Sequence, residues 1–441
     1  MLADLAGPSW SWRLGVAVVL TGVGAGIGGI VLILLLHAVQ RLAYGYRSGP
    51  FLEGVQHASS VRLVLALTAA GLITATAWWA LRRWAEPLTG SGVALRSPHR
   101  RMRLLPTVAD GVIQIVAVAA GASLGREAAP KEVGAASGSA LAERIGLSVA
   151  QRRLLVACGA GAGMAAVYNV PLGGALFALE VLLGSVALRL AVPAVVSAAV
   201  ATAVAGLARP DLPTYLVGRL PSSPSLLVFA AVLGPVAGLA GVAIIRLSAW
   251  ARRGAPTGWR LVPSITLAFA GLGVVGTAVP QLLGNGQNEV QLAATGQLGA
   301  GLLLVLAVGK PLATAACLRA GATGGLFTPV LTTGAALGGL AGLGWGHLWP
   351  GTTSIAGAVV LAAATLGAAS LGPLSSLVLV LELTGTTQGL VVPMVIAVAG
   401  ATLTSRALDG RSIYTSPTSS SPAPPSPTDV TSGRSTGTGW G

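Results

Sequence analysis

The sequence predicts an all-α integral membrane protein built from many helices, and three observations carry this prediction. Only 9% of the 441 residues are charged, and 53% are hydrophobic. A soluble domain carries about 25% charged residues, so this chain lacks the polar side chains needed to cover a surface that faces water. Apolar runs recur from Leu14 to Leu408, and a helix needs about 20 apolar residues to cross a bilayer.

The apolar runs differ in length, and this indicates more than a simple bundle. We count roughly a dozen to fourteen runs, several of them too short to span alone. Short runs predict tilted, re-entrant or broken helices, which membranes tolerate only inside protein or beside a water-filled cavity. The pattern therefore indicates a permeation pathway. The first run, 14–42, is too long for a cleavable signal peptide.

The net charge of +14 does not indicate a nucleic-acid partner, because the basic residues follow the membrane pattern. Arginines that flank apolar runs are typical of cytoplasmic loops, so we expect residues 82–103 to be cytoplasmic. These arginines are Arg82, Arg83, Arg96, Arg100, Arg101 and Arg103.

An internal repeat divides the chain into two homologous halves. Gly121-Ala122-Ser123-Leu124-Gly125 resembles Gly321-Ala322-Thr323-Gly324-Gly325, 200 positions later. Val170-Pro171-Leu172 followed by Glu180 resembles Gly372-Pro373-Leu374 followed by Glu382. Transporters built from two halves bind substrate near the bilayer midplane, where discontinuous helices meet. We expect an inverted repeat, although these motifs do not themselves give the orientation.

The predicted organisation has five parts. They are an N-terminal cytoplasmic or interfacial segment at 1–12, a first transmembrane half at 13–207, a linker at 208–224, a second half at 225–415 and a tail at 416–441. The linker is rich in Pro and Ser, and the tail in Ser, Thr, Pro and Gly. The tail cannot bury enough apolar surface to fold, so we expect it to be disordered.

Four short segments carry the chemistry, and the first three stand where a helix is expected to begin. They are Gly90-Ser91-Gly92-Val93, Gly125-Arg126-Glu127-Ala128-Ala129-Pro130, Gly324-Gly325-Leu326-Phe327-Thr328-Pro329 and Asp409-Gly410-Arg411-Ser412-Ile413-Tyr414. A helix N-terminus presents unpaired N–H donors and about half a positive charge. Small residues let those donors reach an anion, and Ser91 and Tyr414 add hydroxyl donors. The segments therefore predict an anion site.

In this order and spacing, the four segments resemble the CLC family of chloride channels and proton/chloride antiporters, and the resemblance covers 13–415. It implies that Ser91 and Tyr414 coordinate a central chloride, and that Glu127 is a gating carboxylate that competes with chloride. It also implies backbone donors in the anion site, at Gly92, Ala128, Leu326 and Phe327. A homodimer with one pore per subunit is implied as well, in a multi-pass protein of the bacterial inner membrane.

The chain departs from the family pattern at three places. Ala128-Ala129-Pro130 replaces the usual Gly-Pro after the glutamate, and Gly92-Val93-Ala94 replaces Gly-Ile-Pro. The intracellular glutamate pair of the antiporters is here Glu180-Val181, so the second member, their inner proton acceptor, is absent. Glu127 and Glu180 remain the candidate proton-pathway residues.

The site residues also have structural interpretations. Ser91 could cap a helix, and Tyr414 could belong to an interfacial aromatic belt. Glu127 could pair with Arg126 or with Lys131, which lies one turn further along. An ionisable group within a span indicates function, so we interpret Glu127 as the gate. Glu180 and Glu382 recur in both halves, which favours a structural role at helix ends.

The predicted function is chloride transport, and the absence of an acid at Val181 favours passive, channel-like conduction gated by Glu127. The alternatives are a proton-coupled chloride antiporter and transport of another anion such as fluoride or nitrate. An enzyme is not expected, because the four histidines are scattered and no nucleophile–base set appears. Chloride is the expected substrate, with no cofactor and no metal site. Cys158 and Cys317 are expected to be small core residues.

Overall fold

The computed structural model of the protein describes residues 11–45, 49–85, 88–97, 99–208, 212–218, 220–385 and 389–414. The predicted segment 1–12 and linker 208–224 lie partly outside the described residues, and the predicted tail 416–441 lies wholly outside them.

Within these ranges every regular element is a helix. The α-helices are α1 (Trp12–Tyr44), α2 (Phe51–His57), α3 (Ser60–Trp84), α4 (Ser91–Arg96), α5 (Leu104–Ala119), α6 (Ala128–Arg144), α7 (Val149–Tyr168), α8 (Pro171–Leu176), α9 (Leu188–Gly206), α10 (Pro224–Arg253), α11 (Leu261–Ala278), α12 (Gln287–Ala294), α13 (Ala300–Arg319), α14 (Phe327–Leu348), α15 (Ser354–Ser370), α16 (Pro373–Thr384) and α17 (Val391–Leu408). A π-helical turn, η2 (Phe177–Leu183), continues α8, and short 3₁₀ turns, η3 (Gly258–Arg260) and η4 (Pro280–Leu282), flank α11.

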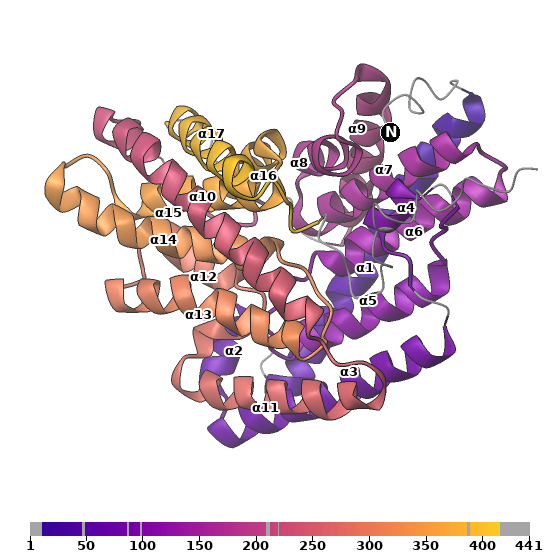
Figure 1. The fold of residues 1–441 in the computed structure, drawn as a ribbon, viewed down its shortest axis with the longest axis horizontal. Coiled ribbons are helices and arrows are strands. Elements are labelled where there is room, and N and C mark those ends of the chain that lie inside the picture. Colours follow the sequence, from indigo (N-terminus) through magenta and orange to yellow (C-terminus); the bar gives the residue numbers. More distant parts are fainter. Residues whose placement is uncertain are drawn as a thin grey trace, which may run out of the picture.

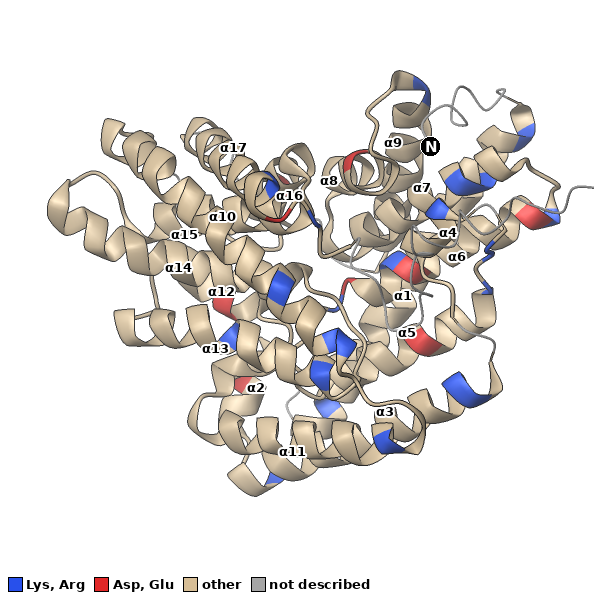
Figure 2. Ribbon diagram, viewed as in Figure 1, with Lys and Arg blue, Asp and Glu red and all other residues tan. Residues whose placement is uncertain are grey.

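Among the described residues, 8 helices are long and apolar enough to cross a membrane. Shorter apolar helices accompany them at Leu104–Ala119, Pro171–Leu183, Ser354–Ser370 and Pro373–Thr384. Charged residues are sparse along the ribbon (Figure 2). The prediction of an all-α membrane protein with spanning and shorter helices is confirmed.

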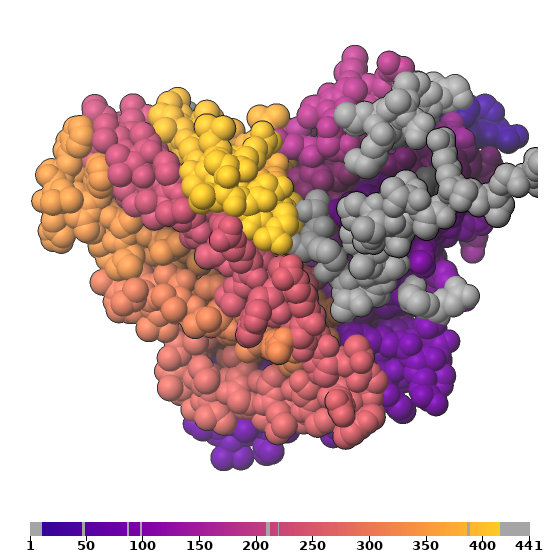
Figure 3. Space-filling model, viewed as in Figure 1, coloured from indigo at the N-terminus to yellow at the C-terminus, as the bar shows by residue number. Residues whose placement is uncertain are grey.

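The two halves of the chain form two lobes (Figure 1). Helices α4 to α9 lie together in one lobe, and α10 with α12 to α17 in the other. Helix α3 of the first half packs on α11 of the second, and α8 packs on α16. The space-filling surface is hollowed between α17 and the α8–α9 region (Figure 3).

Glycine pairs bring equivalent helices of each lobe into close contact. A Cβ atom on Gly134 of α6 would lie 2.1 Å from the carbonyl oxygen of Gly159 on α7. A Cβ atom on Gly338 of α14 would lie 2.0 Å from the carbonyl oxygen of Gly357 on α15. Only a residue without a side chain fits at such distances, which explains part of the glycine content. The same packing in both lobes accords with the predicted repeat.

A wholly buried lysine stabilises the second lobe. Lys310 on α13 is 0% exposed, and its ammonium group donates to the carbonyl oxygens of Leu282, Leu283 and Gly284 at 3.2, 3.4 and 2.7 Å. The N–H of Gly284 in turn donates to the carbonyl oxygen of Gly121 in the first half, at 2.8 Å. The lysine therefore holds the loop through which the two halves meet.

Candidate anion-binding site

Glu127 lies where the first turns of α6 and α14 meet. It is the N-cap residue of α6, but its side chain makes no capping hydrogen bond to that helix. Its carboxylate instead accepts a 2.6 Å hydrogen bond from the backbone N–H of Phe327, the first residue of α14. Phe327 is one of the first N–H donors of a helix, which have no partner within the helix itself. A carboxylate therefore occupies the place where an anion would be held by α14.

Two glycines, one from each half, make room for this carboxylate. Gly125 and Gly325 form an isolated antiparallel β-bridge, with N–H to carbonyl distances of 2.7 and 2.9 Å. A Cβ atom would lie 2.2 Å from a Glu127 oxygen if built on Gly125, and 1.9 Å if built on Gly325. Any side chain at either position would thus displace the carboxylate. The equivalent motifs found in the sequence meet here, across the boundary between the lobes.

Two hydroxyl groups complete the surroundings of Glu127. The Tyr168 hydroxyl, at the end of α7, donates to the second carboxylate oxygen at 3.3 Å, and the Thr328 hydroxyl donates to it at 3.4 Å. The two hydroxyls also contact each other at 2.7 Å. Glu127 and Tyr168 are each 1% exposed, and Thr328 is 0% exposed. These buried donors stabilise a charged group, and Lys131 adds a positive charge that interacts with Glu127 electrostatically.

Tyr414 brings the end of the described chain to the same neighbourhood. Its ring packs edge-on against Phe177 of η2, with 5.0 Å between centroids, and Lys131 lies over it at 5.1 Å. Its hydroxyl is close enough to Glu127 and Tyr168 to interact with them electrostatically. That hydroxyl is buried and makes no hydrogen bond within the part of the chain that the structure describes. An unused buried donor at this position can serve an anion.

Asp409 anchors the segment that ends at Tyr414. Its carboxylate accepts from Arg246 of α10 at 2.8 Å and pairs with Arg411. The hydrogen bonds from Arg411 and Arg246 hold the pKa of Asp409 well below its usual range. The carboxylate therefore stays charged through mildly acidic pH, and these ion pairs persist there.

Ser91 is the first residue of α4, and a second carboxylate lies against it. The Ser91 backbone N–H and hydroxyl donate to the two carboxylate oxygens of Glu132 at 2.7 and 2.8 Å. The Lys131 ammonium group lies 3.0 Å from the same carboxylate. Lys131 thus forms its ion pair with the adjacent Glu132, and it also interacts electrostatically with Glu127, the partner that the spacing suggested. Gly92 follows Ser91, and a Cβ atom built on it would lie 3.4 Å from the Tyr414 carbonyl oxygen.

The remaining predicted backbone donors belong to the first turns of the same helices. Ala128 is the first residue of α6, and Leu326 is the N-cap of α14. All four predicted segments therefore meet in one region. Their roles as anion ligands stay a prediction.

The acidic residues of the repeat cap each other's helices. Glu180 of η2 accepts from the N–H groups of Leu374 and Ser375 at 3.1 and 2.7 Å. Glu382 of α16 accepts from those of Leu172 and Gly173 at 3.0 and 2.6 Å. Each carboxylate thus satisfies free donors at the start of the equivalent helix in the other half. This is the structural role at helix ends that the repeat favoured, and both oxygens of Glu180 are engaged in it.

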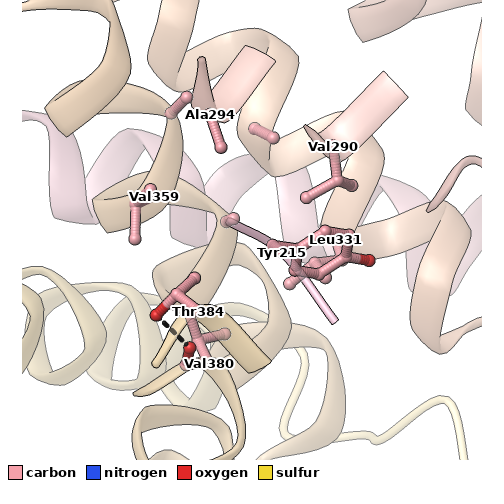
Figure 4. A pocket seen from close by; sticks show the side chains of 10 residues that line it. Tyr215, Val290, Ala294, Leu331, Val359, Val380 and Thr384 are labelled. Atoms are coloured by element: carbon pink, nitrogen blue, oxygen red, sulfur yellow. Dashed lines mark hydrogen bonds between the residues drawn. The ribbon is translucent and has the colours of Figure 1, made fainter. Parts of the chain in front are cut away.

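Two cavities differ in chemistry. The larger, of about 170 Å³, is polar, and it reaches Arg126, the residue next to Glu127. Its lining also includes His37, Gln40, Asn285, Gln287 and Asn288. A smaller apolar cavity lies beside Tyr215, Val290, Leu331 and Val359 (Figure 4). The Thr384 hydroxyl in the wall of the smaller cavity donates to the Val380 carbonyl oxygen at 2.7 Å.

Sequence analysis missed Tyr168 and the contact between Ser91 and Glu132. Tyr168 ends a helix that is buried along nearly all of its length, and a tyrosine at such a position usually needs a hydrogen-bond partner. That signal could have marked it as a polar group of the interior. Glu132 is 41 positions from Ser91, and nothing in the local pattern joins them.

Comparison with known proteins identifies the family. The profile of the family described as voltage gated chloride channel matches residues 70–406. The H(+)/Cl(-) exchange transporter ClcA of Citrobacter koseri is 31% identical over 375 residues, which cover 79% of this chain and 77% of that protein.

Solved structures share the fold. A slow cyanobacterial Cl⁻/H⁺ antiporter superposes with a TM-score of 0.80 at 21% identity, covering 92% of this chain and 97% of its own. A CLC-type fluoride/proton antiporter superposes with a TM-score of 0.73 at 18% identity, covering 92% and 98%. The chain belongs to the CLC family, described as voltage gated chloride channels, and is a multi-pass membrane protein that transports anions.

Proposed function

We propose that the protein exchanges chloride for protons across the bacterial inner membrane. Glu127 is the gate that both controls the access of chloride and binds the proton. The observation that carries the proposal is the 2.6 Å hydrogen bond from the Phe327 N–H to the Glu127 carboxylate. A charged carboxylate there excludes chloride from the same donor. When Glu127 binds a proton it loses the charge that holds it, and chloride can take its place.

Passive conduction was the expectation from the sequence, because Val181 stands where the antiporters have an acid. The comparisons support the alternative better. A relative that matches 79% of this chain at 31% identity is named an H(+)/Cl(-) exchange transporter. We therefore adopt exchange as the proposed activity and chloride as the proposed ion. Glu180 accepts from two N–H groups at the start of α16, which is a structural role at a helix end, and its part in a proton pathway stays a prediction.

Purified protein in liposomes tests the exchange. A chloride gradient is imposed with no initial pH gradient, and chloride and proton movements are recorded together. The proposal expects protons to move uphill as chloride runs down its gradient. Chloride movement without proton movement would support the channel interpretation instead.

We also propose a homodimer with one pathway in each subunit. Many apolar side chains are exposed on the monomer, among them Leu188, Leu267 and Leu403 at 79, 71 and 67%. Lipid and a second copy are the two environments that can cover such surface. Light scattering of the purified protein in detergent measures the mass, and a monomer mass would contradict this assembly.

A further inference from the structure

Glu132 is a second carboxylate on α6, and it is held by a residue predicted to bind the anion. Both of its oxygens accept from Ser91, one from the backbone N–H at 2.7 Å and the other from the hydroxyl at 2.8 Å. Ser91 is 1% exposed, and the Lys131 and Glu132 side chains are 12% and 17% exposed. The group is therefore nearly enclosed, yet it keeps some access to solvent.

A carboxylate and a chloride ion need the same partners. Both are anions that are stabilised by N–H and O–H donors and by a nearby ammonium group. While Glu132 is charged, it uses the two donors of Ser91 and the charge of Lys131. Chloride can bind to Ser91 only if the carboxylate leaves or becomes neutral.

We propose that Glu132 is a second proton-binding group of the transport pathway and competes with chloride for Ser91. A proton from water binds to a Glu132 oxygen, the neutral acid releases Ser91, and chloride takes its place. When the proton leaves, the carboxylate returns and chloride is expelled. This inference rests on the proposed function. It supplies a proton-binding acid in a chain whose position 181, where the antiporters have their inner proton acceptor, is valine.

The surroundings place Glu132 within reach of the gate. Lys131 lies 3.0 Å from Glu132 and over the ring of Tyr414, and the Tyr414 hydroxyl interacts electrostatically with Glu127. Lys131 is therefore shared by the two carboxylates, since it pairs with Glu132 and also interacts electrostatically with Glu127.

Four titratable groups face Glu132 or its partner lysine in the described part of the chain. Lys131 belongs to the same helix, and Asp110 on α5 interacts with Glu132 electrostatically. Tyr414 lies beyond Lys131, and Glu127 interacts with Lys131 electrostatically. Asp110 accepts from the Trp78 indole at 2.8 Å and from the Gln114 amide at 2.6 Å, and neither donor is a predicted anion ligand. Unlike Asp110, Glu132 accepts from a predicted anion ligand.

The test measures chloride affinity by calorimetry over a range of pH, in a background that lacks the first gate. In Glu127→Gln, we expect chloride affinity to fall as pH rises, by up to about tenfold per pH unit where Glu132 loses its proton. In Glu127→Gln with Glu132→Gln, affinity should no longer depend on pH. The control is Glu127→Gln with Glu143→Gln, the same change on the same helix at a partly exposed ion pair with Arg101, and it should keep the slope.

Two results would overturn the inference. One is a pH slope that survives in the Glu127→Gln and Glu132→Gln double variant, which would assign it to another acid such as Asp110. The other is no slope in Glu127→Gln alone. If the double variant does not fold, Lys131→Met in the Glu127→Gln background replaces it. Loss of the ammonium group should move the midpoint of the slope to higher pH, and an unchanged midpoint would contradict the proposal.

The calorimetric result is independent of transport, so the two proposals can fail separately. In liposomes, Glu132→Gln should lower the number of protons moved per chloride ion by about tenfold, because the neutral side chain can no longer carry the proton. If the unaltered protein moves no protons, the exchange proposal fails, while the calorimetry still decides whether Glu132 competes with chloride. If Glu132→Gln keeps the full proton-to-chloride ratio, Glu132 is not a proton carrier.

Discussion

The backbone N–H of Phe327 donates to the carboxylate of Glu127 over 2.6 Å, although the two residues are 200 positions apart. The contact joins the first turn of α14 to the N-cap of α6, and so joins the two halves of the chain. It is unusual for an acidic side chain from one half of a protein to bind the N-terminus of a helix in the other half. This is expected if that N-terminus is an anion site and the side chain competes with the anion for it.

Glu127→Gln should raise chloride flux at neutral pH and weaken its pH response, leaving only the response that Glu132 supplies. In the unaltered protein, flux should rise as pH falls, by at most about tenfold per pH unit, because a proton neutralises the carboxylate and frees the Phe327 N–H. Asp409 does not supply this response, since Arg411 and Arg246 keep its pKa low and its carboxylate charged. Chloride efflux from liposomes between mildly acidic and neutral pH measures the effect.

The control for this change is Glu53→Gln on α2, an exposed carboxylate away from the site. It should keep the pH response of the unaltered protein. If Glu127→Gln also kept that response, Glu127 would not be the gate.

Gly325→Ala should act like a partial loss of Glu127 without altering any titratable group. A Cβ atom at this position would lie 1.9 Å from a Glu127 oxygen, so the carboxylate must move away from Phe327. We expect higher flux at neutral pH and a weaker pH response, measured in the same liposome assay.

Gly344→Ala on α14 is the matched control, because a Cβ atom there meets nothing within 4 Å. It should behave like the unaltered protein. A Gly325→Ala variant with normal flux and normal pH response would mean that the carboxylate does not lie against Gly325 during transport.

Much of this arrangement could be predicted from the sequence, because its signals are local. Helix starts, the repeat and the motif around Glu127 are each readable within a few residues, and together they predicted an all-α fold and the segments that meet. What could not be predicted is which partner each side chain finds across the fold. Lys131 had two acids within one turn, and the choice of Glu132 depends on Ser91, 41 positions away.

The prediction of channel-like conduction shows the same limit. It was based on one residue, the valine at position 181. A proton route depends on which acids gather in three dimensions, and the folded chain places Glu132 beside Ser91 and near Tyr414. No local pattern carries that information.

Ser91→Ala together with Tyr414→Phe should weaken chloride binding. Each variant removes one hydroxyl donor, and a hydrogen bond to a charged group is worth about 1.5–3 kcal/mol, or roughly a tenfold to hundredfold change in affinity. Calorimetry with chloride measures it. Thr404→Val on α17 removes a hydroxyl that donates within its own helix, to the Gly400 carbonyl oxygen at 2.9 Å, and it should leave affinity unchanged. Unchanged binding in the double variant would place the site away from these hydroxyls.

Lys310→Met should lower stability and leave the anion chemistry intact. It removes the ammonium group that satisfies the carbonyl oxygens of Leu282, Leu283 and Gly284, all in the interior. Leaving buried acceptors without a donor costs about 1–3 kcal/mol for each group, so we expect a clear fall in the temperature of unfolding. Thermal unfolding in detergent measures it, and an unchanged unfolding temperature would show that the lysine does not hold this loop.

The most direct test of the central claim is a crystal structure of Glu127→Gln grown with bromide, an anion whose anomalous scattering locates it. Glutamine has no charge with which to compete for the Phe327 N–H, so the account predicts a bromide ion at the place where the Glu127 carboxylate now lies. A structure in which that place holds no bromide, with the ion bound elsewhere or not at all, would contradict the claim that Glu127 occupies an anion site.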